Sequence, residues 1–256
     1  MTRSCGKWAI GVVAACALLL VGSTRVQAAE LDCTSGCVGA NINGALFYTT
    51  DDQSTGTGVI EPFLRIQANG TEDGHNTDAS KPANDEKTGT WTHSVQVDDL
   101  HIETISGTTY YEFLLDINQN TGGDNNLLSL DQLIICTGGA SGDLAVEDTC
   151  PTAAVVYDLG DNWVKLDYDL NPGSGAGDLF VYIPTSLFAG LSGDTYFWLY
   201  SEFGVHNGSN DGFEEWAMQE PSVPELPPIP EPASMMLLGV GLVGVARAAR
   251  KRYSTR

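Results

Sequence analysis

The chain has 256 residues, of which 33 are acidic and 12 are basic, and its formal net charge is −21. A protein this acidic repels phosphate backbones and anionic lipid surfaces, so we exclude nucleic acid as a partner. Both ends have the composition of processing segments, which leaves room for one domain between them.

The first 28 residues have the three-part pattern of a secretory signal peptide. Arg3 and Lys7 give a basic start, an apolar run covers residues 8–22, and small residues surround a predicted cleavage point after Ala28 or Ala29. We therefore predict an N-terminal signal helix that is removed during export.

Short β-branched and aromatic runs, separated by Gly, Asn, Asp and Ser, fill residues 29–220. Nine such runs without βαβ alternation favour an all-β body, a two-sheet antiparallel β-sandwich of jelly-roll-like form, although a barrel remains open. Only residues 184–191 predict a helix, and a brief one. The predicted strands cover residues 45–50, 60–67, 90–97, 110–117, 127–136, 154–159, 163–170, 179–183 and 195–203.

Turn residues predict how some of these strands are connected. Residues 159–163 and residues 171–177 are rich in Gly, Asp and Asn, which favours a hairpin at each position. The long polar segment 69–89 lacks apolar periodicity and predicts a mobile surface loop.

Four cysteines lie after the predicted signal peptide, and an even number in an exported chain indicates disulfides. Three connectivities are possible, of which sequence proximity favours Cys33–Cys37 with Cys136–Cys150. A zinc site is disfavoured, because these spacings do not match zinc-knuckle motifs and the periplasm is oxidising.

One loop suggests calcium as a possible cofactor. Asp116, Asn118, Asn120 and Asp124 place oxygen ligands at alternate positions, as hard divalent cations require. The loop departs from the EF-hand template, because Thr121 occupies the glycine position and no glutamate follows at position twelve. The alternative is a strand end that runs into an Asn/Gly turn.

No motif places a nucleophile beside a base, and we predict no catalytic residue. Glu214 and Glu215 would point to opposite faces of a strand, so they could not act on one bond. The histidines, at positions 75, 93, 101 and 206, show no metal-binding spacing. Aromatic residues could line a sugar-binding cleft or fill the core, and core packing is favoured: Tyr110, Tyr111, Phe197, Trp198, Tyr200, Phe203, Phe213 and Trp216.

The C-terminal region has three successive parts after a proline-rich stalk at residues 221–229. Pro230, Glu231 and Pro232 come first, an apolar stretch over residues 233–246 follows, and a basic cluster ends the pattern. We predict a single membrane helix with the basic cluster in the cytoplasm and the body outside. The basic cluster consists of Arg247, Arg250, Lys251 and Arg252.

This ending resembles the PEP-CTERM sorting signal of Gram-negative bacteria over residues 230–252. The resemblance implies that an exosortase-type membrane enzyme cuts the chain near Pro230-Glu231-Pro232, so that the protein is a substrate. Together with the N-terminal pattern and the proline-rich stalk, it leads us to divide the chain into a signal peptide (1–28), a body (29–220), a stalk (221–229) and a sorting signal (230–256). An ordinary single-pass tail anchor is the alternative.

The resemblance also implies a location and a role. We expect a precursor anchored in the inner membrane, and then a protein at the cell surface or in the extracellular matrix. Its expected role is non-catalytic, structural or adhesive, and associated with exopolysaccharide or biofilm. A calcium-assisted carbohydrate-binding module is the second hypothesis, and a secreted hydrolase is the third.

The part of the chain between the two processing segments is more acidic than the whole. Residues 29–229 contain four basic and 32 acidic residues, which gives a net charge of −28.

Overall fold

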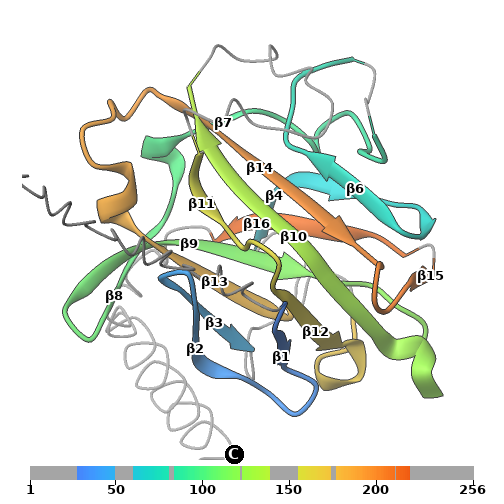
Figure 1. Cartoon of the computed structure of the whole chain (residues 1–256). Helices are drawn as coiled ribbons and strands as arrows, with labels where there is room; N and C mark the ends of the chain where they lie inside the picture. Colours follow the sequence, from blue (N-terminus) through green and yellow to red (C-terminus); the bar gives the residue numbers. More distant parts are fainter. Residues whose placement is uncertain are drawn as a thin grey trace, which may run out of the picture.

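Two seven-stranded sheets form the body. The computed structural model describes residues 28–49, 60–80, 84–121, 123–138, 155–173, 177–210 and 212–219. Sheet A is ordered β1-β12-β10-β14-β6, with β11 beside β10 and β7 beside β14 (Figure 1). Its strands are β1 (Glu30–Asp32), β12 (Trp163–Asp167), β10 (Leu127–Thr137), β14 (Tyr196–Phe203), β6 (Glu72–His75), β11 (Val155–Asp158) and β7 (Val95–Gln96).

Sheet B is ordered β2-β3-β13-β9-β16-β4, with β8 beside β9. Its strands are β2 (Val38–Ile42), β3 (Ala45–Thr49), β13 (Leu179–Pro184), β9 (Thr108–Asp116), β16 (Glu214–Gln219), β4 (Ile60–Ile66) and β8 (Ile102–Ile105). A small third sheet pairs β15 (Ser209–Asn210) with β5 (Asn69–Gly70). Short 3₁₀ helices are η1 (Val97–Asp99), η2 (Gly123–Asn126), η3 (Tyr168–Leu170) and η4 (Thr185–Phe188).

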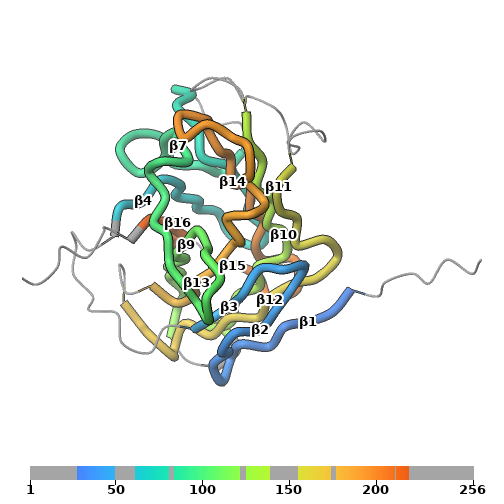
Figure 2. The backbone as a smooth tube through the Cα atoms, turned by 90° about the vertical axis from the view of Figure 1, so that its left-hand side faces the viewer, coloured from blue at the N-terminus to red at the C-terminus, as the bar shows by residue number. Residues whose placement is uncertain are grey.

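The core lies between sheets A and B, which Figure 2 shows as two layers. Side chains alternate along each strand, so Phe113 and Leu115 of β9 enter this core while Glu112 faces away from it. The Phe113 ring meets the Phe197 ring of β14 edge to face, with centroids 5.6 Å apart. Trp216 is fully buried, and its Nε1 donates to Ser201 Oγ of the other sheet at 3.0 Å. The two-sheet all-β prediction is thereby confirmed, with antiparallel pairing throughout the described strands except for the parallel pair β1–β12.

The predicted hairpin at residues 159–163 is wrong. Both β11 and β12 pair antiparallel with β10, so they run in the same direction along the same edge of it. The Gly/Asp/Asn turn therefore interrupts one edge strand and does not reverse the chain. Its conformation is still that of a tight turn, because Gly160 has a φ of +69° and its N–H donates to Asp158 Oδ1 at 2.7 Å.

The predicted hairpin at residues 171–177 is also wrong. This segment follows η3 at the end of β12 in sheet A and leads into β13 in sheet B. It therefore crosses from one layer to the other, because β13 pairs with β3 and β9.

The segment 69–89 is more ordered than the predicted mobile loop. It contains β5 and β6, and it contributes buried polar side chains, including Glu72 and Glu86. Polar residues are buried here because they bond to the backbone: Asn76 Oδ1, for example, accepts from the Leu199 N–H at 2.7 Å. The sequence pattern missed this segment because it lacks apolar alternation.

Most of the other predicted strands are found, with shifted ends. The predicted strand 90–97 shrinks to β7, and residues 168–170 form η3 instead of continuing β12. The predicted helix at 184–191 is the single turn η4. Strands β1, β2 and β8 were not predicted, because each is short and half exposed.

The predicted signal helix and membrane helix lie outside the described residues. Within the ranges that the structure does describe, no helix has the length and apolarity needed to span a membrane.

Candidate functional site

A pocket of about 560 Å³ opens on sheet A where the edge strand is interrupted between β11 and β12. Two local irregularities shape it: the turn at residues 159–162, and a bulge in β10 between Leu130 and Gln132. The residues that line it are Ala28, Asp131, Gln132, Ile134, Asp158, Gly160, Asp161, Trp163, Glu202, Val205 and His206.

Asp131, at the β10 bulge, organises one side of the pocket. Its Oδ2 accepts from Ser129 Oγ and from the Val205 N–H, each at 2.7 Å, and its Oδ1 lies 2.5 Å from His206 Nδ1. The carboxylate is buried, whereas the His206 side chain is 45% exposed. Asp131 therefore fixes both the position and the ring orientation of His206.

The rings of His206 and Trp163 stack face to face, and we call this pair the aromatic platform. Their ring centroids are 4.2 Å apart and the ring planes differ by 2°. Trp163 begins β12 and is half buried. Because the two rings lie face to face, each covers one face of the other, and the pair can offer a ligand an outer ring face and the polar ring edges.

The polar groups around the platform are mostly acceptors. Asp158 at the end of β11 and Asp161 in the interrupting turn are exposed, and Glu202 accepts from Gln132 Nε2 at 2.6 Å. Among the described residues that line this pocket, none is a lysine or an arginine. The pocket therefore suits a neutral ligand that donates hydrogen bonds, and it disfavours an anionic one.

Ala28 borders the pocket at the predicted signal cleavage point, and the Ala29 carbonyl accepts from the Trp163 N–H at 3.2 Å. Cleavage after Ala28 would remove this border and leave the new terminus beside the platform.

The structure separates the two adjacent glutamates of β16, as the sequence predicted. Glu214 points into the core, where its Oε1 accepts from Gln119 Nε2 at 2.6 Å. Glu215 lies on the other face, with its Oε1 2.6 Å from Arg65 Nη2. The Arg65 guanidinium also lies over the rings of Trp91 and Phe213. These carboxylates cannot form a glycosidase pair.

The predicted calcium ligands occupy different surroundings. Asp116 is buried at the end of β9, opposite Glu215. The exposed Asn120 donates its N–H to Asn210 Oδ1, and the Asn118 carbonyl lies against Gly212. Asp124 belongs to η2. Calcium at this loop stays a prediction.

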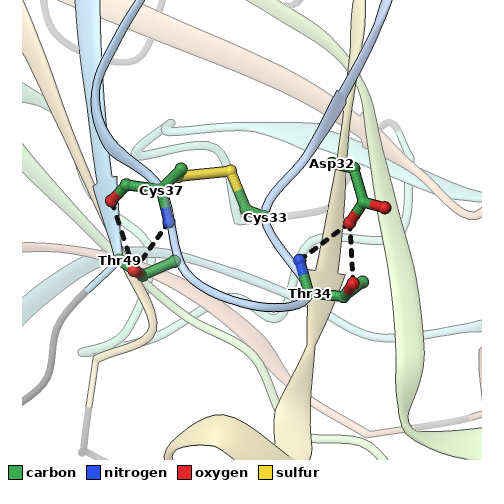
Figure 3. Close-up of a disulfide and its surroundings, with 5 residues drawn as sticks. All are labelled: Asp32, Cys33, Thr34, Cys37 and Thr49. Carbon is green, nitrogen blue, oxygen red and sulfur yellow. Dashed lines mark hydrogen bonds between the residues drawn. A yellow bond between two sulfur atoms is a disulfide. The ribbon is translucent and has the colours of Figure 1, made fainter.

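The predicted disulfide Cys33–Cys37 is confirmed, with Cα atoms 4.9 Å apart (Figure 3). Cys136 is also disulfide-bonded. Its predicted partner, Cys150, lies outside the described residues.

Core packing, the favoured use of the aromatic residues, is confirmed for Phe197, Phe203 and Trp216. Tyr111 is only partly buried against this core, and Tyr110 packs against the smaller cluster of Leu114, Phe180 and Tyr182. The platform residues Trp163 and His206 were missed by the sequence analysis, because 43 positions separate them and no motif links them. The only signal was that Trp163 starts an alternating strand directly after a turn.

Sequence comparison addresses the C-terminal tail. A family model described as the PEP-CTERM protein-sorting motif matches residues 228–252. The chain carries a PEP-CTERM sorting motif. The match includes Pro230, Glu231 and Pro232 and extends through Arg252, so the resemblance seen in the sequence is confirmed. The motif implies an exported protein with a membrane-anchored precursor, which an exosortase, a membrane enzyme, processes.

No curated protein and no solved structure matches the chain. The residues of the sorting motif and the basic cluster lie outside the described ranges.

Proposed function

We propose that the body of this PEP-CTERM protein is a non-catalytic adhesive module that binds a neutral polysaccharide at the cell surface or in the extracellular matrix. The observation that carries the proposal is the Trp163–His206 platform, bordered by acceptor side chains, with no lysine or arginine among the described lining residues. Sugar rings stack on aromatic faces and donate hydroxyl hydrogen bonds to carboxylates and amides.

Charge supports a neutral ligand. The body carries a net charge of −28, so a uronic-acid polymer would be repelled by the protein as a whole. Export, as the sorting motif implies, would bring the pocket into contact with exopolysaccharide.

The pocket carboxylates support binding over catalysis. Asp131 already accepts two hydrogen bonds and pairs with His206, and Glu202 is held by Gln132. A general acid would need a carboxyl group that can reach the scissile bond and is shielded from water, and the other two pocket carboxylates, Asp158 and Asp161, are exposed. Incubation with bound oligosaccharides should therefore release no product.

Replacement of the platform tests the proposal. The sample is the processed protein from the cell surface, and its intact mass should place the ends near Ala29 and Pro230. On an array of neutral and uronic-acid oligosaccharides, we expect binding to neutral members only. The variant Trp163→Ala should weaken that binding about fivefold or more, because stacking contributes on the order of 1 kcal/mol.

Trp91→Ala is the matched control. Trp91 is 43% exposed and packs on Arg65, away from the pocket, so its loss should leave glycan binding unchanged. Equal binding by wild type and Trp163→Ala, or a preference for uronic acids, would reject the proposal. A chelator arm separates the calcium-assisted alternative, because only that mechanism loses binding in EDTA.

A further inference from the structure

A second cluster of ligating side chains lies on the outer face of sheet B, on the hairpin of β8 and β9. One nitrogen or oxygen atom from each of His101, Glu103 and Glu112 lies within 4.8 Å of the other two. The hairpin extends from the body on the opposite side from β15 (Figure 1). This cluster is therefore independent of the pocket on sheet A.

The strand ladder brings these three residues together. The Glu112 N–H donates to the His101 carbonyl at 3.0 Å, which places the two residues opposite each other. Glu103 follows His101 by two positions, so both side chains share one face of the extended chain. His101 Nε2 and Glu103 Oε2 are 3.7 Å apart.

Glu112 is unusual because it is a buried carboxylate with an unused oxygen. The residue is 3% exposed, and its Oε1 has no hydrogen-bond partner among the described residues. Buried carboxylate oxygens normally have a donor or a cation beside them. Within this cluster Glu112 has two neighbours, the His101 imidazole and the Glu103 carboxylate. A carboxylate donates no hydrogen bond, and a neutral imidazole whose lone pair faces the cluster donates none to Glu112 either.

The remaining contact of Glu112 orients it. The Tyr182 hydroxyl on β13 donates a hydrogen bond to the Glu112 carboxylate. Burial raises the pKa of the Glu112 carboxyl, an effect that His101 and the Tyr182 hydroxyl oppose and the Glu103 charge reinforces. A neighbouring ligand carboxylate and a fixed hydroxyl donor are common around metal-bound carboxylates.

We propose that His101, Glu103 and Glu112 bind one divalent transition-metal ion, Zn²⁺ being the best fit, with Tyr182 as the positioning residue for Glu112. One imidazole and two carboxylates supply a net charge of −2, which balances the ion. The imidazole selects against Ca²⁺ and Mg²⁺, which prefer oxygen ligands alone. Ligands at about 2 Å in a tetrahedral site lie about 3.3 Å apart, so the atoms, which lie within 4.8 Å of one another, need to close by about 1.5 Å at most.

The ion would fasten an edge of sheet B. Strand β8 pairs only with β9 among the described strands, and its Ile102 is 52% exposed. A metal ion bound to both strands joins them through side chains as well as through the backbone. Three protein ligands also leave a fourth position for water.

Zinc titration of the full chain in mild detergent tests the site. The protein is first stripped with EDTA, and millimolar Ca²⁺ is then kept present to occupy weak acidic sites on the surface. Calorimetry should show one zinc ion per chain, and the melting temperature should rise with zinc. Cobalt in place of zinc should give visible d–d absorption bands that zinc then removes.

The variants His101→Gln, Glu103→Gln and Glu112→Gln should each weaken zinc binding by about 100-fold or more. Glu61→Gln is the matched control, because Glu61 is an exposed glutamate on β4 of the same sheet, and it should bind zinc as the wild type does. If the buried Glu112→Gln variant fails to fold, the half-exposed His101 and Glu103 variants still decide the question. Absence of a stoichiometric zinc site in the wild type, or a site that survives the His101 and Glu103 variants, would overturn the proposal.

Discussion

Gly204 shows how one residue positions the pocket. It ends β14 with a φ of +86°, and its N–H donates to the Ser129 carbonyl at 3.0 Å. From there the chain turns directly into Val205 and His206, two of the lining residues. A Cβ built on Gly204 would lie 2.0 Å from the Gly70 carbonyl oxygen, so backbone from two segments meets at a point that only glycine allows.

Gly204→Ala should therefore destabilise the protein by roughly 3 kcal/mol, through left-handed strain and overlap with the backbone. Gly44→Ala is the control: its φ is +95° but it has open space around the Cβ position, so strain alone should cost about 1 kcal/mol. Urea unfolding of both variants measures the difference. Equal losses would mean that the close approach to Gly70 contributes nothing.

At the scale of elements, the interruption between β11 and β12 is what creates the pocket. A continuous strand would cover this edge of β10 with ladder hydrogen bonds, whereas the turn displaces Asp158 and Asp161 toward solvent beside Trp163. The Asn43 side chain on the β2–β3 turn fixes the interruption, because its Nδ2 donates to the Asp158 and Leu159 carbonyls. Sheet B thus holds the irregular edge of sheet A in place.

The Cys33–Cys37 disulfide, between β1 and β2, also connects elements of the two sheets. Cys37 is tied to β3 through Thr49, whose Oγ1 accepts from the Cys37 N–H at 3.0 Å (Figure 3). The bond therefore joins β1 in sheet A, through Cys33, to β3 in sheet B.

Replacement of both Cys33 and Cys37 by serine should lower the free energy of unfolding by about 2 kcal/mol, the value for closing so short a loop. Thermal melting checks this, with a loss of several degrees expected. Thr34→Ala is the control, because it removes only the exposed hydrogen bond to Asp32 Oδ1 in the same loop. A double variant as stable as the control would show that β1 and β2 are held by backbone pairing alone.

For the whole molecule, buried carboxyl groups that bridge the two sheets govern the response to pH. Glu214 of sheet B and Glu72 of sheet A are both fully buried and meet in the core. Burial raises the pKa of Glu214 well above its usual value, and the Glu72 carboxyl adds to this. Burial likewise raises the pKa of Asp178, with a further contribution from Asp116.

The raised pKa of Glu214 fixes the sign of its own contribution to the pH dependence. Above about pH 4.5 the unfolded chain releases the Glu214 proton, while the folded protein keeps it up to the raised pKa. Because the folded state binds more protons in that window, the free energy of unfolding should fall as pH rises through it.

Glu214→Gln should remove this contribution, because its amide can donate to Glu72 while its oxygen still accepts from Gln119. We expect the variant to be more stable than the wild type by about 1 to 2 kcal/mol at pH 8 and nearly equal to it at pH 4.5. Urea unfolding at several pH values measures this, with the exposed Glu61→Gln as control. If the free energy of unfolding of the variant depends on pH as that of the wild type does, the proton responsible is not on Glu214.

A strand could be predicted from the sequence where residues close together in the chain determine it. Strands such as β9, β13 and β14 were predicted correctly because apolar and polar residues alternate along them. This pattern involves only residues that are close together in the chain. Strand β6 was missed because it buries the polar residues Glu72 and His75, whereas an alternating pattern is recognised by buried apolar residues; Glu72 meets Glu214 of the other sheet, and His75 pairs with Glu86. The wrong hairpin at residues 159–163 had correct turn residues, but turn residues do not say which strand will pair with the next one.

The sequence by itself determined export, the sorting tail, the acidic charge, the all-β class and the Cys33–Cys37 bond, because each rests on composition or on residues close together in the chain. The tertiary structure alone decided which strand lies beside which, and therefore every candidate site. Trp163 meets His206 across 43 positions, and Glu112 meets His101 across a hairpin, because hydrogen-bonded ladders bring distant residues to one face. Long-range strand pairing minimises the free energy of the whole core, and no local pattern contains that information.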